Sequence, residues 1–343
     1  MRILKNTLFV TNPGAYLSLD GENIVVQRES SEVGRIPLHN LESIVTCGYT
    51  GASPALMAAC CKRQIALSFL SPSGHFLGRV SGAQQGNVLL RRIQYRIADD
   101  PAGRSELSRP MIAAKLYNAR WVLERAIRDH ALRVDTHALR TVCGQLRDGI
   151  QQVQDCTDDG TLRGIEGKMA AAYFGVFDQL ILQNRDGFSF VGRNRRPPLD
   201  PVNCLLSFVY TLLAHDTAAA LETVGLDPYV GFLHTDRPGR MSLALDLMEE
   251  LRAVVADRFV LTLINKRQVT PNGFVIRENG AVRMEDETKR TVLKAWQERK
   301  QEIIAHPFLG EKLEWGLVPY AQALLLARYL RGDLDGYPPF LWK

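Results

Sequence analysis

The spacing of apolar residues changes near residue 85, and this change limits the possible fold more than any other feature of the chain. Before it, apolar and polar residues alternate at 16–19, a hairpin turn follows at Asp20-Gly21, and a second apolar run starts at 24–26. After it, apolar residues recur at helical spacing over long segments. We therefore predict an α+β protein, with a small N-terminal β-rich domain over 1–84 and a larger all-α C-terminal domain over 85–343.

The same patterns predict the individual elements. In the β-rich domain, further strands are expected at 44–45, 65–70 and 75–80. Ser53 is the expected N-cap and Pro54 the expected first residue of a short helix that runs through 57–62. Serine, glycine and glutamine over 81–86 mark the domain boundary. In the second domain, the predicted helices are 88–97, 107–129, 163–182, 201–224, 242–257, 287–304 and 319–330.

Composition and missing motifs argue against several classes of protein. The best candidate for a membrane segment, 204–214, is shorter than the ~18–20 residues that a membrane helix needs, so we expect a cytoplasmic protein with no membrane association. The sequence contains no phosphate-binding loop, dinucleotide-binding turn, serine-hydrolase elbow or zinc-protease motif. The net charge of +5 permits a nucleic-acid partner without arguing for one.

Acidic residues gather on one side of the predicted helix 242–257. Asp246, Glu249, Glu250 and Asp257 fall within about 100° of arc opposite the apolar face, and no Lys or Arg shares that arc. Clustered carboxylates repel one another unless a cation lies among them, and Mg²⁺ and Mn²⁺ prefer oxygen ligands. Mn²⁺ also accepts imidazole, which His234 in the preceding loop could supply. The alternative is that these acids form the solvated face of an amphipathic helix.

Positive charge is distributed unevenly along the chain. Residues 62–147 hold 15 Lys and Arg against 6 Asp and Glu, so this segment carries a surplus of nine while the rest of the chain is net negative. A second basic group, Arg193, Arg195 and Arg196, precedes a Pro-Pro break. Beside a metal site, these three arginines are candidate contacts to DNA phosphates; in a plain solvated loop they would mean little.

Three motifs carry a resemblance to a known family. They are Asp200-Pro201-Val202-Asn203, Gly231-Phe232-Leu233-His234, and Ser242-Leu243 followed by Asp246 and Glu249. Over essentially its whole length the chain resembles the CRISPR-associated integrase and endonuclease of spacer acquisition, the first-numbered Cas protein. Its overall texture is similar to the subtype I-C branch.

The resemblance implies a site for Mg²⁺ or Mn²⁺ with one ligand from each of three places. Glu166 matches the family's helix-borne glutamate, His234 its loop histidine, and Glu249 its last acidic ligand. Asp246 matches an acidic position that supports the site, and Arg237 matches a basic position near the scissile phosphate. On this resemblance Glu166, His234, Glu249 and Asp246 are the predicted catalytic residues.

The resemblance also implies an activity and its partners. The 3′-hydroxyl of a short captured DNA fragment would attack the backbone of CRISPR repeat DNA, with water as the nucleophile in a nuclease side reaction. The expected partners are double-stranded DNA with 3′ ends, a second copy of the chain and the small second-numbered Cas protein. Residues 1–84 would serve dimerisation and DNA contact. The alternatives are a stand-alone metal-dependent nuclease and a non-catalytic DNA-binding scaffold.

Overall fold

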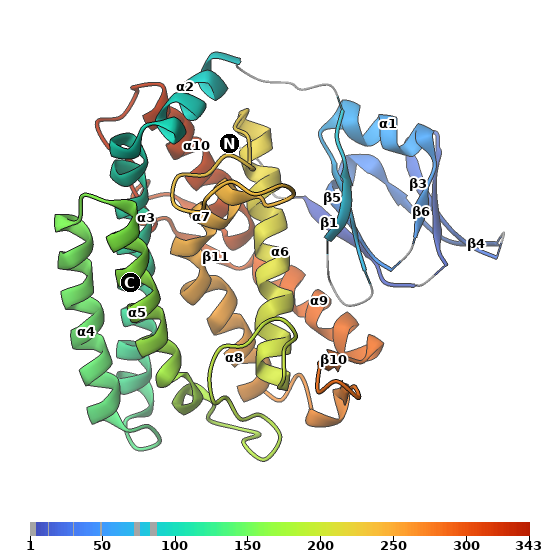
Figure 1. Cartoon of the computed structure of the whole chain (residues 1–343). Coiled ribbons are helices and arrows are strands. Elements are labelled where there is room, and N and C mark those ends of the chain that lie inside the picture. The colour runs from blue at the N-terminus through green and yellow to red at the C-terminus, as the bar shows by residue number, and fades with distance from the viewer. Residues whose placement is uncertain (1–4, 13, 30, 49, 72–75, 83–87) are drawn as a thin grey trace. The chain divides into compact units, whose positions relative to one another are not determined.

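The chain folds into two compact units. A computed structural model describes residues 5–12, 14–29, 31–48, 50–71, 76–82 and 88–343. The first unit consists of Met1–Gln85 and Met284–Gln301, and the second of Gly86–Arg283 and Glu302–Lys343 (Figure 1). The predicted boundary segment 81–86 lies largely outside the described residues, as does His75 at the start of a predicted strand.

One sheet of the first unit is mixed. Its strands lie in the order β1 (Asn6–Val10), β5 (Leu41–Cys47), β7 (Ala66–Leu70) and β8 (Phe76–Val80). The first three run parallel to one another, whereas β8 returns antiparallel to β7. The parallel pairs need crossover connections, and the chain between β5 and β7 includes a helix.

The other sheet is built around the predicted hairpin. Its order is β4 (Ser31–Pro37), β3 (Asn23–Arg28), β2 (Tyr16–Asp20) and β6 (Gly51–Ala52). Strands β2 and β3 are joined through Gly21, whose φ of +57° is a conformation that glycine adopts without strain. The hairpin prediction is confirmed.

Apolar side chains from both sheets form the core of the first unit, together with α1 (Pro54–Arg63). The Ser53 side chain accepts a hydrogen bond from the Leu56 amide at 3.2 Å, so the predicted N-cap is also confirmed. Leu56 is fully buried in the same core as Leu17 and Leu67.

The first unit also contains a helix from late in the sequence. In α9 (Asp286–Gln301), the Lys300 ammonium donates to Thr7 Oγ1 at 3.3 Å, and Arg290 donates to Asn12 Oδ1 at 3.3 Å. The division at 84/85 placed this helix in the second domain, and the structure corrects that assignment. Helical spacing predicts the helix but does not tell on which domain it packs.

The second unit is mostly helical rather than all-α. Two short strand pairs, β9 with β10 and the antiparallel pair β11 with β12, interrupt the helices. Helix α4 was missed by the sequence analysis, although Asp135 caps it. The helices are α2 (Val88–Asp99), α3 (Pro101–His130), α4 (Thr136–Asp155), α5 (Asp159–Gly175), α6 (Pro201–Val224), α7 (Ser242–Leu251), α8 (Arg258–Asn265) and α10 (Val318–Leu330); the strands are β9 (Phe274–Ile276), β10 (Val282–Met284), β11 (Ile303–Ala305) and β12 (Lys312–Glu314).

Helix α6 packs against α7 and α10, while α3 packs against α4, α5 and α7 (Figure 1). Within the described parts of the chain, α6 alone is long and apolar enough to cross a membrane, and 72% of its most apolar window is buried inside the protein. It is therefore a core helix here, and it holds α7 in place from one side.

Candidate metal centre

The acidic side chains of α7 and its continuation are buried. After α7 the chain passes through a π-helical segment, Arg252–Asp257, into α8. Asp246, Glu249, Glu250 and Asp257 are only 1%, 3%, 0% and 2% exposed. The interpretation of these acids as a solvated face is wrong. Buried carboxylates need partners, and these four find different ones.

Asp246 binds the loop that precedes α7. Its carboxylate accepts the backbone amides of Phe232 at 2.6 Å, Leu233 at 3.0 Å and His234 at 2.9 Å. The same oxygen that accepts the His234 amide lies 2.6 Å from His234 Nδ1. A carboxylate at Nδ1 fixes the imidazole so that Nε2 is the nitrogen able to bind a cation. Asp246 therefore orients His234, as the resemblance implied for a supporting acid.

Gly231 explains why the loop can approach α7 so closely. A Cβ atom at this position would lie 2.8 Å from an Asp246 carboxylate oxygen and 2.8 Å from the Ser242 backbone. Any other residue would push the loop away from the start of α7. The glycine of the Gly231–His234 motif thus permits the close contact through which Asp246 holds His234.

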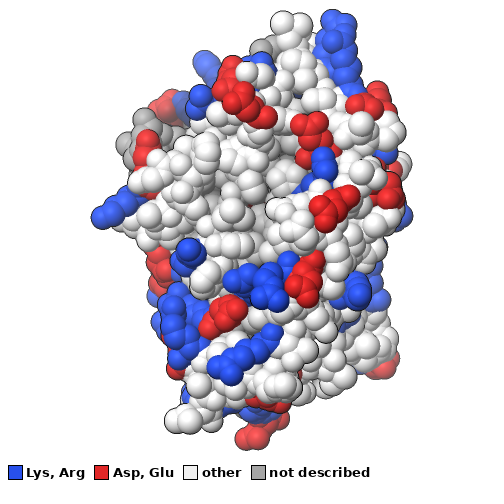
Figure 2. All heavy atoms as spheres, turned by 90° about the vertical axis from the view of Figure 1, so that its left-hand side faces the viewer, with Lys and Arg blue, Asp and Glu red and all other residues white. Residues whose placement is uncertain are grey.

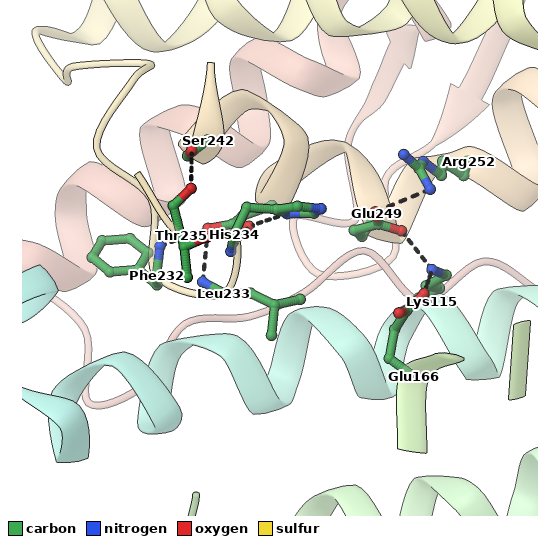
Figure 3. A network of polar contacts seen from close by, with 10 residues as sticks. Lys115, Glu166, Phe232, Leu233, His234, Thr235, Ser242, Glu249 and Arg252 are labelled. Atoms are coloured by element: carbon green, nitrogen blue, oxygen red, sulfur yellow. Dashed lines mark hydrogen bonds and ion pairs between the residues drawn. The ribbon is translucent and has the colours of Figure 1, made fainter. Parts of the chain in front are cut away.

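Glu249 meets Glu166 across a single cation. The ammonium of Lys115, from α3, hydrogen-bonds Glu166 Oε1 on α5 and lies 2.8 Å from Glu249 Oε2 on α7 (Figure 3). The other Glu249 oxygen pairs with Arg252 Nη1 at 3.1 Å, one turn along the chain. Three helices therefore converge on the two predicted carboxylate ligands.

Charge keeps Glu249 ionised inside the protein. Burial raises the pKa of its carboxyl group, but the positive charges of Arg252 and Lys115, together with His234, outweigh burial and bring the pKa to about 2. His234 contributes to this lowering, and Figure 3 shows His234 and Glu249 next to each other in one network of polar contacts. The site thus presents an anionic carboxylate at neutral pH.

Glu250 and Asp257 point to other parts of the second unit. Glu250 accepts the hydroxyl of Tyr337 at 2.6 Å, which attaches the C-terminal segment to α7, and burial raises its pKa to about 7. Asp257 accepts the hydroxyl of Tyr210 at 2.5 Å, and burial raises its pKa to about 6. Neither residue belongs to the group around Lys115, so the four acids do not form one cluster.

The donor set fits a divalent ion of the Mg²⁺ or Mn²⁺ type. Glu166 and Glu249 offer hard carboxylate oxygens, and His234 offers an imidazole nitrogen. Glu249 Oε2 is buried and has no hydrogen-bond partner in the described part of the chain; its contact with Lys115 is an ion pair. Among the described residues no three His, Cys, Asp or Glu side chains stand together as a finished ion site. Lys115 occupies the position between the two carboxylates.

The predicted DNA-contacting arginines separate into two groups. Arg195, Arg196 and Arg237 are exposed. Partial burial lowers the pKa of Arg240, and so do the positive charges of Arg237, Arg195 and Arg196, while Asp246 raises it. The four arginines are therefore close enough to repel one another. They gather around the loop that carries His234.

Arg193 has an internal role instead. Its guanidinium donates to Asn203 Oδ1 at 2.6 Å and to Ser207 Oγ at 3.0 Å, and it lies over the ring of Tyr210. These contacts fasten the 193–196 loop to the start of α6. The structure therefore gives Arg193 a structural place in the loop rather than the phosphate contact that the sequence suggested.

The basic surplus of 62–147 does not form one positive face. On α3, Arg120 pairs with Glu124, and both Arg125 and Arg128 pair with Asp129. Figure 2 shows the face at the left of Figure 1, where basic and acidic side chains are interspersed. Several basic residues of this segment thus pair with acids of the same helix, and its positive charges are scattered around the helix as the sequence suggested.

Sequence reasoning missed two residues of the site. Nothing in the local pattern around Lys115 distinguishes it from the other basic residues of its helix. Arg252 had a signal, because it follows Glu249 by three residues and such pairs meet on one helix face. The helical angles predict that Arg252 lies off the acidic side of the helix, and its ion pair with Glu249 corrects this prediction.

Comparison with known proteins assigns the family. A model described as "CRISPR associated protein Cas1" matches residues 8–298. The chain is 51% identical to CRISPR-associated endonuclease Cas1 1 of Chlorobaculum tepidum over 98% of both chains, and 50% identical to CRISPR-associated endonuclease Cas1 2 of Rhodospirillum rubrum over the full length of both. The chain therefore belongs to the Cas1 family of CRISPR-associated proteins. Its place in the I-C branch stays a prediction.

Solved structures share the fold. A CAS1 protein from Thermotoga maritima superimposes with a TM-score of 0.82 at 21% identity, covering 98% of this chain and all of that one. A casposase bound to an integration product also has a TM-score of 0.82, at 24% identity, covering 97% of this chain and 92% of that one. The arrangement of N-terminal strands followed by a mostly helical region is thus the arrangement of Cas1 structures.

Proposed function

We propose that the chain is a metal-dependent DNA integrase and endonuclease that inserts short captured DNA fragments into a CRISPR repeat array. One observation carries the proposal: Glu166 and Glu249, from different helices, meet at one cationic position beside a histidine whose ring is fixed by Asp246. The family supports the same assignment, because the curated relatives at 51% and 50% identity are CRISPR-associated endonucleases.

In this proposal Glu166, His234 and Glu249 hold Mg²⁺ or Mn²⁺. When bound, such an ion polarises the phosphodiester and stabilises charge on the attacking and leaving oxygens. The protein's own residues prepare the site. Asp246 keeps Nε2 of His234 available, and Arg252 holds one oxygen of Glu249 while the other faces Lys115.

The DNA would lie along the loops around His234. Arg237 and Arg240 lie in the loop just before α7, and the nearby Arg195 and Arg196 add further positive charge. Together these four side chains could contact the phosphates of a DNA duplex. The 3′-hydroxyl of the fragment would attack a phosphorus of the repeat strand, so that one phosphorus–oxygen bond forms and another breaks. With water as the nucleophile, the same site would cleave DNA.

The proposed function implies particular partners and a cellular location for the chain. One solved structure that shares the fold, at 22% identity, is a Cas6-RT-Cas1–Cas2 complex. We propose that this chain likewise joins the small second-numbered Cas protein, acts as a homodimer through its β-rich unit, and works in the cytoplasm. We also propose CRISPR repeat DNA and duplexes with free 3′ ends as its substrates.

A strand-transfer assay tests the proposed function. Purified protein is incubated with Mn²⁺, a labelled short duplex with free 3′ ends, and a supercoiled plasmid that carries a repeat. We expect labelled plasmid from the unmodified protein and none from Glu166→Gln, His234→Ala or Glu249→Gln. Asp159→Asn is the matched control, because Asp159 is an ion-paired carboxylate on the same helix as Glu166 but contacts Arg104 instead of Lys115. It should retain activity.

The other outcomes select the alternatives. Cleavage without joining would identify a stand-alone nuclease. DNA binding without any chemistry, unchanged in the three site variants, would identify a scaffold and overturn the proposed function.

A further inference from the structure

Lys115 is placed where a cation bridges two anionic side chains from different helices. Its side chain is 12% exposed, against 25% for Glu166 and 3% for Glu249. The ammonium hydrogen-bonds Glu166 and is ion-paired with Glu249 at 2.8 Å. Without Lys115, two carboxylates would face each other in a largely dry environment, where like charges repel strongly.

The two cations that contact Glu249 differ in how freely they can move. Arg252 lies with its guanidinium 4.8 Å from the centre of the Tyr210 ring, which limits its movement, and is ion-paired with Oε1 of Glu249 at 3.1 Å. Lys115 carries its ammonium at the end of a flexible four-carbon stem, and this ammonium is ion-paired with Glu249 Oε2 at 2.8 Å. Lys115 is therefore the cation that can leave, while Arg252 stays.

We propose that Lys115 is an exchangeable internal counter-ion: it holds Glu166 and Glu249 together in the metal-free protein and gives up both carboxylates when a divalent ion binds. This inference rests on the proposed function, in which the same two carboxylates are ligands. It adds a role for Lys115, which the proposed function does not include. Lys115 stabilises the empty site and weakens metal binding, since the ion must displace it.

Metal binding, measured without DNA, tests the inference. Mn²⁺ is titrated into the full-length protein, and free Mn²⁺ is followed by its electron paramagnetic resonance signal. We expect Lys115→Met to bind Mn²⁺ about tenfold more tightly than the unmodified protein, a change of ~1.4 kcal/mol. In EDTA the same variant should have the lower Tm, and saturating Mn²⁺ should close that difference.

Two further variants make the comparison specific. Lys289→Met is the matched control, because Lys289 is also a largely buried, ion-paired lysine, 3.1 Å from Asp286, but lies on α9 in the other unit. Its Mn²⁺ affinity should equal that of the unmodified protein. If Lys115→Met does not fold in EDTA, Lys115→Gln serves in its place, since it removes the charge and keeps a hydrogen-bond donor.

The outcomes separate this inference from the proposed function. Equal or weaker Mn²⁺ binding by the Lys115 variants, with Glu249→Gln still losing the ion, would overturn the counter-ion role and leave the metal site intact. No Mn²⁺ binding by the unmodified protein, or undiminished binding by Glu249→Gln, would overturn both.

Discussion

Replacing Asp246 with asparagine tests how the site is held together. The carboxylate binds two groups with each oxygen: Oδ2 accepts the amides of Phe232 and Leu233, and Oδ1 accepts the amide of His234 and contacts its Nδ1. If the asparagine NH₂ replaces Oδ2, the two amide contacts of that oxygen are lost. If it replaces Oδ1, the contact with the His234 amide is lost and the contact with Nδ1 becomes a weaker, uncharged one in the wrong tautomer. At about 1.5–3 kcal/mol for each hydrogen bond to a charged group, the loss of stability is about 3–6 kcal/mol.

Two measurements follow from this magnitude. In a unit of this size each kcal/mol lowers the Tm by about 2–4 °C, so Asp246→Asn should lower it by at least about 6 °C. Because the imidazole of His234 also loses its orientation, Mn²⁺ affinity should fall about 10–100-fold, the usual cost of removing such a support. Differential scanning calorimetry gives the first value and a Mn²⁺ titration the second.

Glu250→Gln is the control for this prediction. Glu250 is a buried acid on the same helix, but its partners are Tyr337, Gln322 and the Phe340 amide. Its substitution should leave the Mn²⁺ affinity within about twofold of the unmodified protein. Undiminished Mn²⁺ binding by Asp246→Asn, or an equal loss in Glu250→Gln, would refute the orienting role of Asp246.

Three further predictions concern the loop, the pH dependence and the DNA. Gly231→Ala should lower Mn²⁺ affinity at least about tenfold, since its Cβ would lie 2.8 Å from the acid that orients the histidine. Burial raises the pKa of Asp257 to about 6 from an ordinary value near 3.8, so the folded protein binds this proton more tightly than the unfolded chain does. The free energy of unfolding should therefore be higher by about 3 kcal/mol below pH 4, and this gain should be lost as the pH rises from 4 through 6. Asp257→Asn should remove that change in urea unfolding curves. The double variant Arg195→Ala/Arg196→Ala should lower the slope of log K against log salt for duplex binding by up to about 2, whereas Arg193→Ala should lower the Tm.

Each of these has a contradicting result. Normal Mn²⁺ binding by Gly231→Ala would show that the loop tolerates a side chain. If the free energy of unfolding varied with pH in the same way in the unmodified protein and in Asp257→Asn, the carboxyl group of Asp257 would have the same pKa in the folded and unfolded states. An unchanged salt slope in the double arginine variant would place the DNA elsewhere.

Local spacing predicted much of the fold. The predicted helix at 201–224 has the bounds of α6, and the turn at Asp20-Gly21 joins β2 to β3. The predicted helix 242–257 covers α7 and the π-helical segment. These elements carry their signals within a few neighbouring residues. The short pairs β9–β10 and β11–β12 carry none, because three-residue strands are too short to show a period.

The site was predictable only in part. Spacing showed that Asp246 and Glu249 lie on the same side of one helix, but their partners lie far away in the sequence. Lys115 is 51 residues from Glu166, and no periodic pattern relates them. Likewise, the arc shared by four acids suggested one cluster, whereas packing directs Glu250 to the C-terminal segment and Asp257 to Tyr210.

The most direct test of the proposed site is anomalous X-ray diffraction from crystals of the protein grown with Mn²⁺. We predict one strong anomalous peak roughly 2.0–2.3 Å from carboxylate oxygens of Glu166 and Glu249 and from Nε2 of His234, with the Lys115 ammonium moved away. A structure with no peak at this position, and with Lys115 still between the two carboxylates at saturating Mn²⁺, would contradict it.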